Sequence, residues 1–243
     1  MARIREQSRE DLIGHDGAVK PHPHPIPRPT PTPAPPPFRA AHYTASLDSI
    51  EILNTRSRHE DSDKCSVSVG INDENPATVT KDLGDLNNGV FQVGLHVGPS
   101  AINAPTDKFA FNYLVLNSGH QDWETTNKTL TQIGNTLASA GAKAATTAAG
   151  TLIGASVGGV VLPVIGSILG AAAGWLVGEL TGLLTADCDG PVAVEQVALT
   201  GEQLWTNTQH GSFTHSTYHP GIDSAHGCGS NSIYIAHWSI SRT

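Results

Sequence analysis

Glycine recurs at every fourth position through most of residues 148–186, and this spacing constrains the fold more than any other feature of the chain. The glycines in this register are Gly150, Gly154, Gly158, Gly166, Gly170, Gly174, Gly178 and Gly182. Residues four apart share one face of an α-helix, so the spacing leaves a groove in which a second helix can pack closely. Each glycine costs a helix about 1 kcal/mol relative to alanine, and close helix contact is the natural compensation. The spacing predicts a glycine-zipper helical segment.

The same segment is free of charge and long enough to enter a membrane. No charged residue lies between Lys143 and Glu179. The run from Val164 to Leu184 approaches the ~20 residues that a helix needs to cross a bilayer. Pro163 separates it from the first run and fits a turn or a kink. Two membrane geometries follow: a helical hairpin with its tip near Pro163, or a single span over 164–184 with the first run at the interface. The alternative outside a membrane is a hairpin buried permanently inside the protein.

The residues on both sides of this segment have the patterns of β-structure. Strict alternation of apolar and polar residues over Cys65–Ile71 predicts a half-buried strand, and Val90–Val97 and Phe109–Leu116 are two further strand candidates. The C-terminal run Ser232–Ile240 alternates in the same way. Turn-rich stretches separate these runs, including 54–64 and 98–107, and 192–204 fits either a strand or a short helix. We expect an α+β chain, in which an antiparallel β-sandwich is interrupted by an inserted glycine-zipper helical hairpin.

These patterns divide the chain into four parts. Residues 1–40 form a disordered arm rich in proline and histidine, and 41–120 form the first part of the sandwich. Residues 121–186 are the helical insertion, which begins with a helix over 122–147, and 187–243 complete the sandwich. Alternating prolines over 20–37 favour extended polyproline II, which suits a spacer or a ligand for a delivery or docking partner.

Charge and the N-terminal sequence limit the partners and the location. The first 39 residues carry six basic and four acidic residues, whereas the rest carries eight and eighteen. An acidic body argues against nucleic acid as a partner, because phosphate binding needs clustered Lys and Arg. The N-terminus lacks the apolar core of a Sec signal peptide. We expect a soluble form that is cytoplasmic or released without a Sec signal, and that reaches a target membrane on insertion.

Carboxylates gather in three turn-rich places. The stretch 54–64 contains Glu60, Asp61 and Asp63, residues 72–75 contain two acids, and Asp187 and Asp189 follow the zipper. Carboxylates on loops at one end of a sandwich can converge on Ca²⁺, which takes six to eight oxygen ligands. The alternative is that these acidic loops are simply solvated.

A resemblance to a known family rests on two of these stretches. Leu47–Leu53, followed by the run from Glu60 to Val69, resembles the first strand, acidic loop and second strand of C2-type calcium-binding sandwiches. The resemblance implies Asp61 and Asp63 as calcium ligands, with Asp187 and Asp189 as the second acidic pair. The layout of the whole chain is similar to bacterial membrane-active effectors that carry a helical hairpin on a soluble body.

No catalytic signature accompanies these features, and we expect no enzyme: the chain lacks a nucleophile elbow, a P-loop, a dinucleotide fingerprint and a His-Glu-x-x-His motif. We therefore expect a membrane-inserting protein, an oligomeric pore-former or toxin-like effector, whose partners are lipid and copies of itself. The alternative is a calcium-dependent binding or structural module with a buried hairpin. Three cysteines leave at least one unpaired within the chain. The spacing allows a Cys188–Cys228 disulfide but does not establish it. Seven histidines after residue 95 suggest acid as a trigger for insertion.

Overall fold

The computed structural model describes residues 37–57, 61–119, 121–148, 189–220 and 232–243. The chain divides into two units, Met1–Pro35 and Pro36–Thr243, and every described residue belongs to the second. The arm over 1–36, all eight zipper glycines and Asp187 lie outside the described residues.

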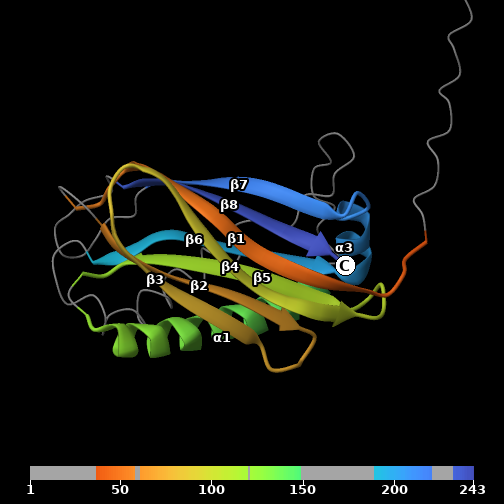
Figure 1. Ribbon diagram of the computed structural model, residues 1–243. Helices are drawn as coiled ribbons and strands as arrows, with labels where there is room; N and C mark the ends of the chain where they lie inside the picture. The colour runs from red at the N-terminus through yellow and green to blue at the C-terminus, as the bar shows by residue number, and fades with distance from the viewer. Residues whose placement is uncertain (1–36, 58–60, 120, 149–188, 221–231) are drawn as a thin grey trace, which may run out of the picture. The chain divides into compact units, whose positions relative to one another are not determined.

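Two antiparallel four-stranded sheets pack face to face and form a β-sandwich (Figure 1). Sheet A has the order β4-β1-β8-β7, built from β1 (Ala41–Asn54), β4 (Gly89–Ile102), β7 (Ser212–Pro220) and β8 (Ile233–Arg242). Sheet B has the order β3-β2-β5-β6, built from β2 (Asp61–Ile71), β3 (Ala77–Leu86), β5 (Lys108–Asn117) and β6 (Gly190–Thr200). The sandwich-like architecture expected from the sequence is thus confirmed.

Alternation along the strands builds the core between the sheets. On β8, Tyr234, Ala236, Trp238 and Ile240 are buried, and the residues between them are partly exposed on the outer face. The largest aromatic side chains meet here: the rings of Phe111 and Trp238 lie 5.4 Å apart. Because side chains alternate with period two, this register fixes which residues face the core and which face outward.

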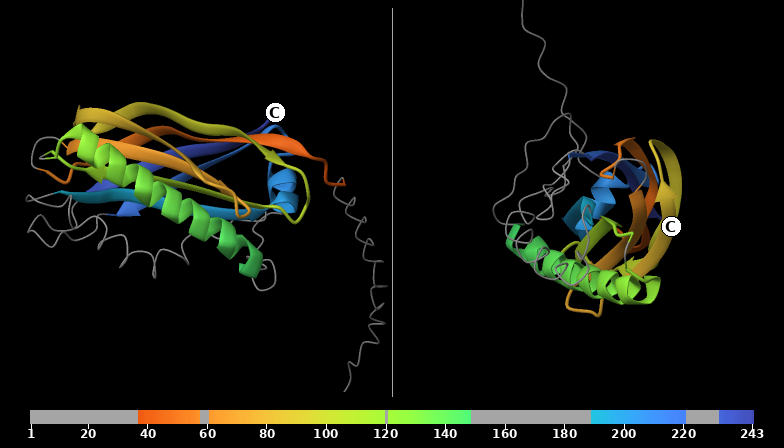
Figure 2. Two further views of the ribbon diagram at one scale, coloured as in Figure 1. Left: turned by 90° about the horizontal axis from the view of Figure 1, so that it is seen from below. Right: turned by 90° about the vertical axis from the view of Figure 1, so that its left-hand side faces the viewer.

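A long helix covers the outer face of sheet B. The helix α1 (Trp123–Ala148) lies between β5 and β6 in the sequence and runs along the sheet (Figure 2, left). Its Leu130, Ile133 and Leu137 pack on Leu114 and Leu116 of β5 in a second apolar cluster. The expected helix over 122–147 is therefore present, and it is packed on the sandwich.

Several local expectations need correction. The stretch 54–64 is not wholly a turn, because β2 begins at Asp61, and β4 continues to Ile102 through 98–102. β3 was not expected, because Ala77–Leu86 carries many polar residues on a sheet edge. The segment 192–204, which fitted either a strand or a helix, contains one after the other. β6 ends at Thr200, and the short helix α3 (Gly201–Asn207) follows, with a capping box formed by Thr200 and Gln203 at its start.

Among the helices that the structure describes, none has the length and apolar character to span a bilayer. This finding does not cover the zipper glycines, which lie outside the described residues.

Candidate functional site

Asp61 and Asp63 lie at the start of β2, point into the sandwich and are fully buried. The hydroxyl of Tyr234 on β8 lies between them, 2.7 Å from Asp61 Oδ2 and 2.9 Å from Asp63 Oδ2. One hydroxyl proton cannot serve both carboxylates. Burial, followed by the charge of Asp61, raises the pKa of Asp63 well above its usual range. The raised pKa shifts Asp63 toward its protonated form, in which Asp63 and Tyr234 can each supply a proton to the two contacts.

Asp61 collects donors from four residues. The backbone N–H groups of Arg56 and Ser57 donate to it at 2.6 and 2.7 Å, and the amide of Asn117 donates at 3.2 Å. Tyr234 is the fourth donor. Such a set of donors stabilises a buried negative charge without a metal ion.

Asp189 lies at the same end of the sandwich, where the chain re-enters sheet B. It is buried, and its Oδ1 accepts a hydrogen bond from the backbone of Gly119 at 3.3 Å. Next to it, Gly190 lies against the guanidinium of Arg56: an added Cβ would stand 2.9 Å from Arg56 Nη1. Arg56 in turn donates to the carbonyl of Pro191 at 3.1 Å. These contacts fix the start of β6, which is the point where the insertion ends.

The structure thus gathers three of the four predicted calcium ligands at one end of the sandwich, and Asp187 lies outside the described residues. Within the described part of the chain, no group of three or more His, Cys, Asp or Glu side chains could hold a metal ion. Asp61 and Asp189 accept hydrogen bonds from protein N–H groups instead. Calcium binding by this end of the sandwich stays a prediction.

A second polar cluster lies between the sheets, where edge strands β6 and β7 face each other. Glu195 of β6 is 1% exposed, and burial raises its pKa to about 7. Its partner is the hydroxyl of Thr217 on β7, which also accepts from Trp238 Nε1 at 3.1 Å. On the same face of β7, His219 Nε2 lies 2.7 Å from the hydroxyl of Tyr113. Burial lowers the pKa of His219 to about 4, so the imidazole is neutral at physiological pH.

Sequence reasoning missed this cluster and Tyr234. The signal for Glu195 was present, since it is a lone acid inside the apolar run 192–199. A carboxylate in such a strand must find a partner or hold a proton. Tyr234 gave no comparable signal, because tyrosine is common in strands.

The helix α1, which leads into the segment 149–188, is held in place by close contact with sheet B. A Cβ on Gly70 of β2 would stand 2.5 Å from the backbone oxygen of Ala138, and a Cβ on Gly141 would stand 2.8 Å from Ala110 Cβ. The amide of Gln196 donates to the carbonyl of Leu137. Small residues on both sides therefore let the helix backbone approach the sheet.

The two ends of the segment 149–188, which are the end of α1 and the start of β6, are attached at opposite ends of sheet B. α1 begins where Lys64 Nζ donates to the carbonyl of Gln121, close to Asn117, which pairs with Gly190. Further along, Gly141 lies over Ala110. Seven strand residues separate Ala110 from Asn117, a distance of about 23 Å. The helix continues beyond Gly141 for about 10 Å more.

Comparison with known proteins adds no family: no protein-family model matches this sequence, and no curated protein is similar to it.

Proposed function

We propose that the protein inserts into lipid membranes and assembles there as an oligomeric pore-forming or toxin-like effector. The β-sandwich is the folded carrier, and residues 149–188 supply the membrane element. One observation carries the proposal: a chain with an acidic body contains an uncharged segment from 144 to 178, with glycines in a helix-packing register. The Pro-rich arm would dock a delivery partner or a neighbouring subunit.

The topology of the body favours one of the two membrane geometries. β1 to β5 precede the insertion and β6 to β8 follow it, yet β5 pairs with β6 and β1 pairs with β8. A single span would place these two groups of strands on opposite sides of the bilayer and would separate the sheets. An intact sandwich therefore requires an even number of crossings, as in the hairpin with its tip near Pro163.

The points of attachment set a second condition on a hairpin. Two packed antiparallel helices end about 8–10 Å apart, whereas the attachment points at the end of α1 and at Gly190 are roughly 30 Å apart. The residues that flank the hairpin must be extended, or the last turns of α1 must leave sheet B. Leu130, Ile133 and Leu137 hold the first half of α1 by apolar contact. The C-terminal half relies more on alanine and glycine contacts, so it is the part that would separate.

The alternative function is a C2-like, calcium-dependent binding module with a hairpin that never leaves the protein. The convergence of Asp61, Asp63 and Asp189 favours it. The donors around Asp61 and the raised pKa of Asp63 weigh against it, because calcium would have to displace the hydrogen bonds and would need Asp63 in its charged form, which burial disfavours.

Dye release from anionic liposomes by the purified chain, at neutral and acidic pH and with or without calcium, tests the proposal. The negative control replaces residues 149–188 with a Gly/Ser linker of equal length, because deletion would pull together attachment points that are far apart. Such a linker has a root-mean-square span of about 35 Å, so it can join them. We expect leakage from the intact chain and none from the control.

A matched pair of variants tests the zipper contact itself. Gly174→Leu fills the predicted groove, and Ala172→Leu adds similar bulk to the opposite helix face. We expect Gly174→Leu to abolish oligomers and leakage, and Ala172→Leu to retain both. Equal leakage by the two variants would refute the contact, and no leakage or liposome binding by the intact chain under any condition would refute the proposed function.

A further inference from the structure

The outer face of sheet A carries rows of uncharged polar side chains that cross all four strands. One row runs from β4 to β7 through His96, Ser46, Ser239 and Thr214. The next runs through Gln92, Ser49, His237 and Ser216. Alternation places these side chains on the face opposite the core. Antiparallel sheets commonly turn one polar face to solvent, and here the polar side chains are continuous over two rows.

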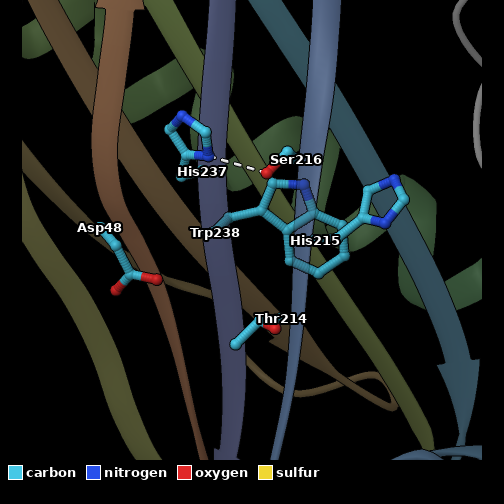
Figure 3. Close-up of a pocket in the computed structure, with 6 residues that line it drawn as sticks. All are labelled: Asp48, Thr214, His215, Ser216, His237 and Trp238. Carbon is cyan, nitrogen blue, oxygen red and sulfur yellow. Dashed lines mark hydrogen bonds between the residues drawn. The ribbon is translucent and has the colours of Figure 1, made fainter. Parts of the chain in front are cut away.

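These side chains share one chemical property. A hydroxyl, an amide and a neutral imidazole each donate and accept hydrogen bonds. One pair is already joined, since Ser216 Oγ lies 2.7 Å from His237 Nδ1 (Figure 3). The hydroxyl groups of a sugar also donate and accept, so a face of this kind matches a polyhydroxylated ligand.

The charge on the face excludes anionic ligands. The four strands of sheet A contain a single Lys or Arg residue, Arg242. Its guanidinium lies 4.1 Å from the centre of the Trp205 ring. The face therefore presents no cation from its strands, while Asp48 and Glu51 add negative charge. Phosphate, sulfate or nucleic acid would be repelled.

An open depression of about 400 Å³ lies across the second row. Its polar side chains come from the neighbouring strands β1, β8 and β7 and are Asp48, Thr214, His215, Ser216 and His237 (Figure 3). Asp48 occupies a bulge of β1, where the pairing with β8 shifts between Leu47 and Ser49. The extra residue places a carboxylate among the hydroxyls, and a carboxylate accepts two hydrogen bonds from neighbouring sugar hydroxyls. The volume falls within the range of small-molecule sites.

An exposed aromatic ring stands beside the depression. Tyr218, two residues after Ser216 on the same face of β7, is 56% exposed. Among the described residues, it is the aromatic member of a small set of exposed large hydrophobic side chains. The apolar C–H face of a sugar ring packs on such a π-surface, while the tyrosine hydroxyl stays hydrated.

We propose that the outer face of sheet A binds a neutral carbohydrate in the depression between Asp48 and the Thr214–Ser216 segment, with Tyr218 as the stacking surface. The carboxylate of Asp48 accepts hydrogen bonds from the sugar hydroxyls, and the hydroxyl of Ser216 donates one to the sugar. These bonds orient the ligand. The site is independent of the membrane segment, so it holds whether or not the protein forms pores.

The experiment is saturation-transfer NMR and calorimetry on the full chain. The probes are neutral di- and trisaccharides of glucose, galactose, mannose and N-acetylglucosamine, with sialylated and sulfated counterparts for comparison. We expect at least one neutral probe to bind and its anionic counterpart to bind at least tenfold more weakly. Binding of none of the neutral probes, or preference for the anionic ones, would overturn the proposal.

Variants that keep the size of the side chain test whether the sugar binds in the proposed depression. Asp48→Asn and Thr214→Val should each weaken binding, by about tenfold for the charged hydrogen bond and about threefold for the neutral one. Thr136→Val, on the exposed side of α1, is the matched control and should bind as the parent does. Circular dichroism and melting temperature confirm that each variant is folded. Unchanged affinity in both face variants would show that the sugar binds elsewhere and would refute the site.

Discussion

Replacing Glu195 by glutamine should change how the stability of the sandwich depends on pH. Burial raises the pKa of Glu195 from its ordinary 4.5 to about 7. Between these values the folded state holds a proton that the unfolded state has lost, so the free energy of unfolding falls as pH rises. A tenfold difference in proton affinity between the two states corresponds to about 1.36 kcal/mol. The stability lost through Glu195 between pH 5 and pH 8 is therefore about 2.5 kcal/mol.

His219 has the opposite effect over a lower range. Burial lowers its pKa from 6.5 to about 4, so the unfolded state binds the extra proton and stability falls as pH drops through this window. The two contributions nearly cancel between about pH 4.5 and 6.5. Acid alone is therefore a weak trigger for opening the sandwich at this edge, and the histidine-based acid trigger has to act through other groups.

Urea unfolding of the parent and of Glu195→Gln from pH 4 to pH 8, followed by circular dichroism, measures the effect. The advantage of the variant over the parent should grow by about 2.5 kcal/mol from pH 5 to pH 8, equivalent to about 5–10 °C in Tm. Because only the change of the free energy of unfolding with pH is compared, any pH-independent effect of the amide on stability cancels. Glu202→Gln, which alters an exposed carboxylate on α3, is the control. Parallel profiles for Glu195→Gln and the parent would refute the buried, protonated state of Glu195.

Three other results follow from the structure. Gly70→Ala should destabilise the protein by about 1–3 kcal/mol in urea, because the new Cβ meets the Ala138 backbone at 2.5 Å; an unchanged midpoint would contradict the close packing of α1. Tyr234→Phe should cost about 1–3 kcal/mol, because Asp61 and Asp63 lose the hydroxyl that lies within hydrogen-bond distance of both, and the loss should shrink in Asp63→Asn if the two residues act together. Calcium should leave Tm unchanged relative to chelator, because protein donors already surround Asp61, whereas a rise in Tm that Asp63→Asn removes would establish the predicted calcium site.

The strands that alternate cleanly were predictable from the sequence, and the reason is physical. β8 buries every second side chain, as period two predicts. β2 and β5 were found as strands, but the expectation that β2 is half-buried was wrong, because α1 covers the outer face of both strands and nearly all of their residues are buried. The amphipathic start of α1 was equally visible through Leu130, Ile133 and Leu137. β3 was not predicted, because it lies at a sheet edge, where few of its side chains are buried and the apolar pattern is weak.

The polar sites were harder to predict, because their properties arise from long-range pairing. Asp61 and Asp63 were recognised as a pair, but a sequence cannot show that Tyr234, more than 170 positions later, places a hydroxyl between them. Taken alone, acids after a turn predict an exposed loop. Once β8 is placed in the centre of sheet A, the same acids become interior groups, and burial raises the pKa of Asp63 well above its usual range.

The place of β8 between β1 and β7 also bears on the order of events during synthesis. A ribosome releases β1 to β5, then the glycine-rich segment, and only afterwards the strand that completes sheet A. The apolar segment therefore leaves the ribosome before the body can close, and it is exposed to chaperones, translocons or lipid during that interval. The nascent segment therefore stays without the completed sandwich until β8 has been translated.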